Sequence, residues 1–431
     1  MNMKQADQSK HSLPNRWLIA VMGTLLMLML GTVYAWSFFQ KPIVTAMGWS
    51  NSQTAWAFSI AILFLGFSAA WGGVNLPRIG PVKLSMTGGA LFALGYMLGG
   101  VALKYHSLQL LYLGFGVVGG IGMGFGYVTP VATVGKWFPD RKGLATGMVV
   151  MGFGFGALLM SKVIGPALMS VTGGDTAATF MLSGMVMCST LVFGFFLKNP
   201  PAGYAPSGYM PAGASDARQH ADSERTAMGC IVSGKWLLMW LVFFCNITAG
   251  IMFIGFQSPM LQDILGRSRP GMDAGALAAA GATLIAASSL FNGMGRFLWG
   301  GLSDRIGRIQ TFRIILASQI IVFIILRYVN SPMIFSLLVC YVLLCYGGGF
   351  GTMPSFVLDV FGARLMPVVY GAILTAWSLA GVAGPQIAAV IKDTCKDTAG
   401  PLTFTIGACL LVAGLVCSFF ISNSRFTGKE V

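Results

Sequence analysis

The most regular feature of the sequence is a series of long apolar runs, each bounded by charged residues, proline or glycine. Each run is about as long as the roughly 20 residues that an α-helix needs to cross the hydrocarbon core of a membrane. We therefore predict twelve transmembrane helices. Their approximate bounds are 17–40, 53–76, 82–103, 108–134, 143–169, 174–197, 235–264, 275–302, 310–329, 332–358, 366–392 and 400–422.

A polar stretch rich in Pro, Gly, Ala and Ser separates the sixth run from the seventh, which is typical of a flexible linker. We predict an N-terminal six-helix bundle (1–197), a cytoplasmic linker (198–234) and a C-terminal six-helix bundle (235–431). A short repeat supports two related halves, because GVNLPRIG at 73–80 and GGLSDRIG at 300–307 each follow the second run of their half. The predicted fold class is an all-α integral membrane protein of two six-helix bundles.

Composition and charge placement agree with this division. Only 9% of the residues are charged, against about 25% in soluble proteins. The net charge of +14 lies mostly in loops: with both termini in the cytoplasm, eighteen Lys and Arg fall in cytoplasmic segments and seven in outer loops. The positive-inside rule therefore predicts cytoplasmic termini. We expect a plasma-membrane protein, in a bacterium the inner membrane, that binds lipids and no nucleic acid.

Other functional classes lack their signatures in this sequence. The eight cysteines are scattered without metal-ligand spacing, and no nucleophile, acid pair or metal cluster of a membrane enzyme is present. A channel would show rings of polar residues or a continuous polar helix face. We therefore expect a transporter that is not an enzyme, has no cofactor and no metal, and is a monomer.

Four motifs resemble those of a known family. GGLSDRIGR at 300–308 resembles the cytoplasmic loop motif of the major facilitator superfamily, and its copy at 73–80 is degenerate, with Pro77 in the acidic position. KWFPDRKGLATG at 136–147, YAWSFF at 34–39 and FNGMGRFLWG at 291–300 are similar to motifs of the oxalate:formate antiporters and monocarboxylate transporters. The resemblance implies transport of a small organic anion by alternating access.

Arg296 is the clearest candidate for binding that anion. It lies eight residues before Asp304, so about 12 Å deeper along the same helix. A buried Arg is costly in a bilayer, by about 2.5–3.5 kcal/mol or more, which indicates that it faces a polar cavity. Its guanidinium suits a carboxylate, and the resemblance assigns it the anion-binding role. Ser288 and Asn292 share its helix face, and Asn292 is a candidate for orienting Arg296 or for contacting the substrate.

Aromatic residues are expected to complete the cavity. The resemblance places Tyr34, Tyr127, Tyr346 and Phe350 around the anion. It also aligns Trp377 with the second cation, a lysine, of the oxalate-specific relatives. A single cation disfavours a dianion, because its second carboxylate would be desolvated without a partner. We therefore predict a monocarboxylate such as lactate or pyruvate.

Two further sets of residues concern the transport cycle. Asp304, with Arg305 and Arg308, is predicted to form a conformational latch at the cytoplasmic ends of the helices. Asp263 and Asp359 lie near span ends and are candidate proton relays. Two mechanisms remain open. One is symport of the anion with a proton, which we favour because one cation matches one monocarboxylate. The other is exchange of carboxylates, as in the oxalate:formate type.

Overall fold

The computed structural model describes residues 14–140, 142–201, 204–206, 226–362, 365–395 and 399–421. The described part contains twelve helical segments that are long and apolar enough to cross a membrane, so the predicted fold class is confirmed. Several spans are built from two or three consecutive helices. The helices before residue 200 are α1 (Arg16–Leu30), η1 (Gly31–Ala35), α2 (Trp36–Met47), α3 (Asn51–Ile79), α4 (Pro81–Lys104), α5 (Leu108–Leu111), η2 (Tyr112–Gly119), α6 (Gly120–Trp137), α7 (Lys142–Leu159), η3 (Met160–Ile164), α8 (Gly165–Val171), α9 (Thr176–Met187) and α10 (Ser189–Phe195).

The second half has fewer and longer helices. They are α12 (Ala227–Ile231), α13 (Gly234–Ser268), α14 (Ala274–Ile306), α15 (Arg308–Leu326), α16 (Pro332–Phe361), α17 (Met366–Ile373), α18 (Thr375–Cys395) and α19 (Ala399–Phe419). The short helix α12 lies within the stretch predicted as linker. The exact domain bounds at 197 and 234 stay a prediction.

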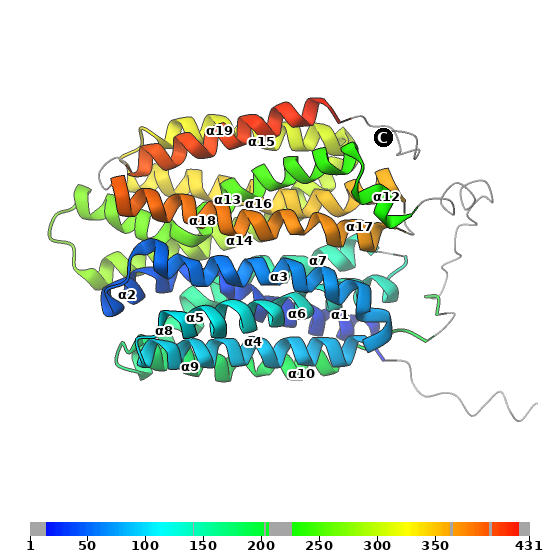
Figure 1. Ribbon diagram of the computed structural model, residues 1–431, viewed down its shortest axis with the longest axis horizontal. Helices are drawn as coiled ribbons and strands as arrows, with labels where there is room; N and C mark the ends of the chain where they lie inside the picture. The colour runs from blue at the N-terminus through cyan, green and yellow to red at the C-terminus, as the bar shows by residue number, and fades with distance from the viewer. Residues whose placement is uncertain are drawn as a thin grey trace, which may run out of the picture.

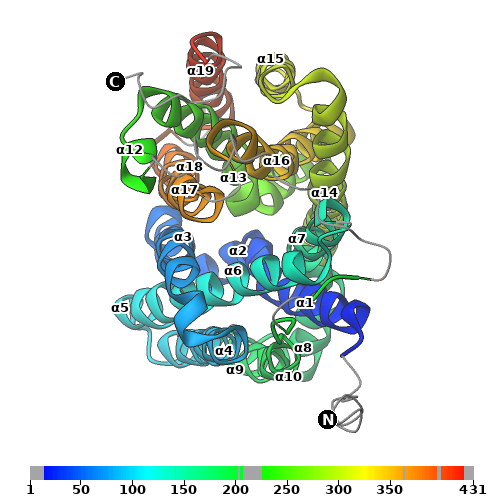
Figure 2. The same ribbon diagram turned by 90° about the vertical axis from the view of Figure 1, so that its right-hand side faces the viewer.

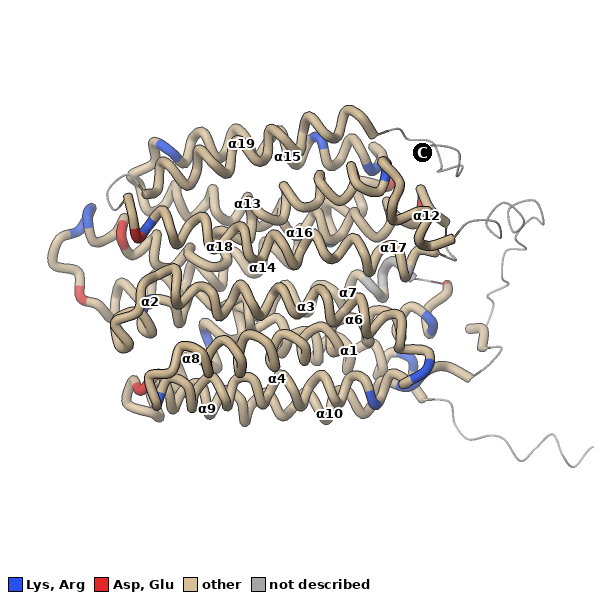
Figure 3. The backbone as a smooth tube through the Cα atoms, in the orientation of Figure 1, with Lys and Arg blue, Asp and Glu red and all other residues tan. Residues whose placement is uncertain are grey.

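The helices form two bundles that lie side by side with their axes nearly parallel (Figures 1 and 2). The N-terminal bundle contains α1 to α10 and the C-terminal bundle contains α13 to α19. The bundles meet along two main lines of contact, α3 against α17 and α18, and α7 against α14, and η1 and α2 also contact α13. We call the end that carries the linker the linker end, and the opposite end the far end. Charged residues gather at these two ends (Figure 3).

The internal repeat is visible in the backbone. Gly80 and Gly307 stand at the same place in the two halves, between the second and third spans, and have nearly equal angles of φ 86°, ψ 152° and φ 90°, ψ 150°. Residues with a side chain rarely adopt this left-handed φ. The glycine that ends each motif is therefore required by the sharp turn that separates two long helices.

Close contact between the bundles depends on residues without side chains. A Cβ atom at Gly154 of α7 would lie 2.7 Å from the Cα atom of Gly293 of α14. On the other line of contact, a Cβ atom at Gly66 of α3 would overlap the hydroxyl of Ser378 of α18. Small residues at such crossings let membrane helices pack backbone to backbone.

Candidate functional site

Arg296 lies at the contact between the bundles. Its side chain is 4% exposed, and Nη1 donates a hydrogen bond to the carbonyl oxygen of Val150 in α7, at 3.1 Å. The atoms Nε and Nη2 are buried, and the described residues give them no hydrogen-bond acceptor. Because an unsatisfied buried charge is costly, this guanidinium has the capacity to bind an anion through its two free nitrogen atoms.

Aromatic rings surround the guanidinium. Its carbon atom lies 5.0 Å from the centre of the Phe350 ring and 5.9 Å from that of Phe153. Ring faces attract a cation but offer it no acceptor. They hold the charge in a fixed place and leave its hydrogen-bonding capacity for a ligand.

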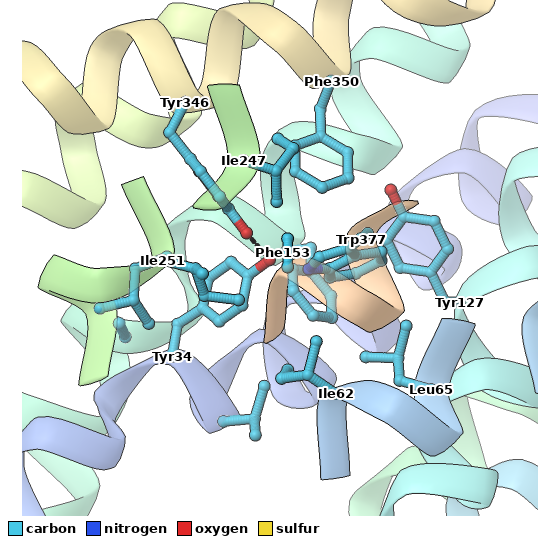
Figure 4. Packing of buried hydrophobic residues seen from close by; sticks show 14 of the residues in the cluster. Tyr34, Ile62, Leu65, Tyr127, Phe153, Ile247, Ile251, Tyr346, Phe350 and Trp377 are labelled. Atoms are coloured by element: carbon cyan, nitrogen blue, oxygen red, sulfur yellow. Dashed lines mark hydrogen bonds between the residues drawn. The ribbon is translucent and has the colours of Figure 1, made fainter. Parts of the chain in front are cut away.

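The predicted aromatic residues converge on the same place from both bundles (Figure 4). Tyr34 comes from η1 and Tyr346 from α16, and their hydroxyl oxygens are 2.6 Å apart. Trp377 of α18 packs edge-on against Tyr34, Tyr127 and Phe350, with ring centres 4.8–6.4 Å apart. The ring of Tyr127 packs edge-on against that of Phe153, which contacts Arg296, with ring centres 5.3 Å apart. The structure thus brings together all five aromatic residues selected from the sequence.

Asn292 lies one helical turn from Arg296 toward the far end and is 2% exposed. Its Oδ1 atom is buried and accepts no hydrogen bond from the described residues. The side chain lines a small cavity of about 10 Å³ together with Tyr34, Gln257 and Ser288, which is room for about one water molecule. The hydroxyl of Ser288 donates to Oε1 of Gln257 at 2.7 Å. Asn292 lines this cavity and Arg296, one turn away, does not, so the expectation that Arg296 faces a polar cavity stays a prediction.

The family model of the Major Facilitator Superfamily matches residues 20–385. This chain belongs to the Major Facilitator Superfamily. Proteins of this family are transporters, and the resemblance drawn from the four motifs is confirmed.

Two similar proteins are named as transporters of organic anions. The chain is 27% identical to the oxalate:formate antiporter of Oxalobacter formigenes, over 91% of this chain and 88% of that protein. It is 24% identical to monocarboxylate transporter 12 of Rattus norvegicus, over 83% of this chain and 75% of that protein. Among solved structures, a D-xylose-proton symporter matches with a TM-score of 0.69 at 14% identity, over 96% of this chain and 99% of that one. The similarity to the symporter structure shows a shared fold and nothing about the substrate.

In this transporter the predicted latch residues lie at the linker end. Arg308 joins two carboxylates, Asp304 at 2.6 Å and Asp359 at 3.0 Å. Arg305 is exposed. All three members of the ion-pair cluster belong to the C-terminal bundle, so the cluster ties α14, α15 and α16 together. Whether it acts as a latch stays a prediction.

The two candidate proton relays lie at opposite ends of the transporter. Asp359 belongs to the linker-end cluster just described. Asp263 pairs with Lys392 at 2.5 Å at the far end. Asp359 is thirteen residues past Tyr346 along α16, about 20 Å away. The structure therefore gives each carboxylate a cationic partner at a distance from the central arginine.

Sequence reasoning missed three groups that the structure places at the interface. Phe153 and Val150 of α7 contact Arg296, and Gln257 of α13 lines the small cavity beside Asn292. Gln257 carried a usable signal, since an amide side chain in a long apolar run indicates a buried polar contact. Phe153 and Val150 are ordinary residues of a membrane helix, and only the packing of α7 on α14 distinguishes them.

Proposed function

We propose that this protein is a secondary active transporter of a small monocarboxylate, and that Arg296 binds the carboxylate. The observation that carries the proposal is the buried guanidinium between the two bundles, with Nε and Nη2 unpartnered in the described structure. A carboxylate matches these two donors with two parallel charge-assisted hydrogen bonds. It also neutralises a charge that is otherwise costly in the membrane.

The number of buried cations supports one carboxylate over two. Among the residues that the structure describes, the buried Lys and Arg are Arg296 and Lys235, and Lys235 stands at the linker end, the second residue of α13. The resemblance aligns Trp377 with a lysine of the oxalate-specific relatives, and the indole ring of Trp377 offers no positive charge. A dicarboxylate would bring a second charge into this centre without a partner, at a cost of several kcal/mol.

The aromatic residues shape the binding site around Arg296 and control access of the anion to it. Tyr34 and Tyr346 come from different bundles and their hydroxyls bond to each other, so a relative rotation of the bundles separates them. Their hydroxyls then become free to donate to an anion on Arg296, while the rings of Phe350 and Trp377 exclude water. Alternating access in this family type moves one bundle against the other around a fixed central site.

The coupling mechanism has two candidates. Proton symport is the preference drawn from the sequence, with Asp263 or Asp359 as relay. The ion pairs of both carboxylates, far from Arg296, favour the second candidate, carboxylate exchange. In exchange, the empty carrier keeps an unpaired Arg296 and is held until another anion neutralises it. The likeness to an oxalate:formate antiporter supports the same candidate.

The proposal includes an orientation. The linker end, which carries more Lys and Arg in its loops, faces the cytoplasm by the positive-inside rule, and the far end faces outward. The transporter acts as a monomer in the plasma membrane, which in a bacterium is the inner membrane.

Uptake of labelled lactate into proteoliposomes tests the function. Uptake is measured with an inward proton gradient, without one, and with unlabelled lactate preloaded. For the wild type we expect saturable uptake, and for Arg296→Ala a fall to the level of protein-free liposomes. Arg313→Ala is the matched control, because Arg313 also lies in a span but contacts Ser418 and Phe419 at the side of the C-terminal bundle.

The outcomes separate the alternatives. Acceleration by the gradient supports symport, and uptake only into preloaded liposomes supports exchange. Equal uptake by Arg296→Ala and Arg313→Ala would contradict the assigned role of Arg296. Absence of lactate movement in all three conditions, with oxalate transported instead, would contradict the choice of a monocarboxylate.

A further inference from the structure

Lys162 is a charged residue inside a span, and the central site does not use it. It lies in η3, in the span Gly147–Val171, about 13 Å from the far end of that span. Its side chain is exposed at the surface of the bundle. The ammonium donates to the hydroxyl of Thr283 in α14, at 2.6 Å. Lys162 thus stands where the two bundles meet at the membrane-facing surface.

The positive charge of Lys162 is not neutralised by the described part of the chain. A hydroxyl accepts a hydrogen bond but carries no charge. The described carboxylates of the far end are engaged elsewhere, either with a lysine or with the backbone N–H groups at the start of a helix. They are Asp175, Asp263, Asp273 and Asp393. Among the residues that the structure describes, Lys162 therefore has no counter-ion nearby.

An apolar groove begins at the same threonine. It has a volume of about 340 Å³ and opens to the outside between α13, α14 and α16. Its lining includes Thr283, Leu261, Leu265, Leu284, Ala287 and Met333. A groove of this kind on the outside of a membrane bundle accommodates an acyl chain, and the ammonium beside it accommodates an anionic head group.

We propose that Lys162 and this groove form a binding site for an anionic phospholipid in the far-end leaflet. The lipid phosphate pairs with the ammonium, and one acyl chain lies against Leu284 and Ala287. Because Lys162 belongs to the N-terminal bundle and the groove to the C-terminal bundle, the bound lipid bridges the two. A soluble phosphate has the same charge but no means of filling the groove, so the lipid is the occupant.

Native mass spectrometry of the purified transporter, titrated with phosphatidylglycerol or phosphatidylcholine, tests the site. One phosphatidylglycerol is expected to bind more tightly than phosphatidylcholine. Lys162→Gln should weaken that binding about fivefold, the size of the attraction between one lysine and an anionic lipid. Ala287→Phe, which fills the groove and keeps the charge, should weaken it as well.

Lys104→Gln is the matched control, because Lys104 is an exposed lysine at the far end of α4 and stands outside the groove lining. An equal loss of phosphatidylglycerol affinity in Lys104→Gln and Lys162→Gln would overturn the proposal, since the loss would then follow from the lower net charge and not from a specific site. Unchanged binding in Ala287→Phe would also overturn it. Displacement of the lipid by millimolar glycerol 3-phosphate would reassign the site to a free phosphate. Thermal unfolding of each variant verifies that it is folded.

Discussion

The two ends of this transporter use carboxylates in different ways. At the far end, Asp393 of α18 accepts hydrogen bonds from Asn51 and Ser52 at the start of α3, at 2.8–3.1 Å. This carboxylate joins the C-terminal bundle to the N-terminal bundle. At the linker end, Asp304 and Asp359 bind Arg308 within the C-terminal bundle. The far end thus has a carboxylate that bonds across the interface between the bundles, whereas the carboxylates that bind Arg308 at the linker end stay within one bundle.

The difference bears on which interactions the transport cycle must break. A contact inside one bundle persists when the bundles rotate as rigid bodies, whereas a contact between bundles is made in one state and lost in another. Hydrogen bonds between the bundles extend from Asp393 at the far end to Arg296. Asp393 therefore stabilises the arrangement in which the bundles touch at the far end relative to one in which they separate there, and the ion pairs of Arg308 are unaffected by that change.

The largest loss of transport is expected from a substitution that forces α7 and α14 apart at the interface between the bundles. Gly154→Leu places a side chain where the α14 backbone lies, since even a Cβ atom would be 2.7 Å from Gly293. Overpacking of this kind costs about 1–3 kcal/mol, which changes the ratio of closed to open states by about 5–150-fold. We expect the initial rate of lactate uptake to fall about tenfold or more. Gly147→Leu in the same helix meets nothing within 4 Å and should transport normally, and a similar loss in both variants would contradict the packing argument.

An intermediate effect, faster opening of the far end, is expected from Asp393→Asn. The carboxylate supplies a charge-assisted cap to α3 from the opposite bundle, and loss of a helix cap costs about 0.5–2 kcal/mol. The reporter is Ala55→Cys in a background without the native cysteines, because Ala55 is buried against Phe256 and Ala388 of the other bundle. We expect a membrane-impermeant maleimide to label this cysteine several-fold faster in Asp393→Asn. Labelling at the wild-type rate would show that the far end is held closed by other contacts.

The smallest effect is expected from Asp359→Asn at the linker end. Its side chain is 54% exposed, and an exposed ion pair contributes about 0.2–1 kcal/mol. The thermal midpoint should fall by a few degrees at most, with no change in the labelling of Ala55→Cys. Faster labelling in Asp359→Asn than in Asp393→Asn would reverse the comparison between the two ends.

Much of the fold follows from the sequence because lipid imposes long uniform runs. The twelve spans were predictable from hydrophobicity, and Arg296 was predictable as a lone charge within a run. Asp393 was not, since in the sequence it is one of several acids near a span end, and its bond to Asn51 joins residues that are 342 positions apart. The binding roles assigned to Arg296, Tyr34 and Trp377 stay predictions until transport is measured.

The glycines of α7 limit how far this part of the sequence can vary. Gly152 and Gly156 face α1, where added Cβ atoms would lie 2.5 Å from the carbonyl oxygens of Thr24 and Leu28. Gly154, on the opposite side, faces α14. Because the backbones of α1 and α14 confine α7 on both sides, only glycine fits at these three alternate positions. A saturation library of α7 should therefore return glycine at 152, 154 and 156, with free variation at 147.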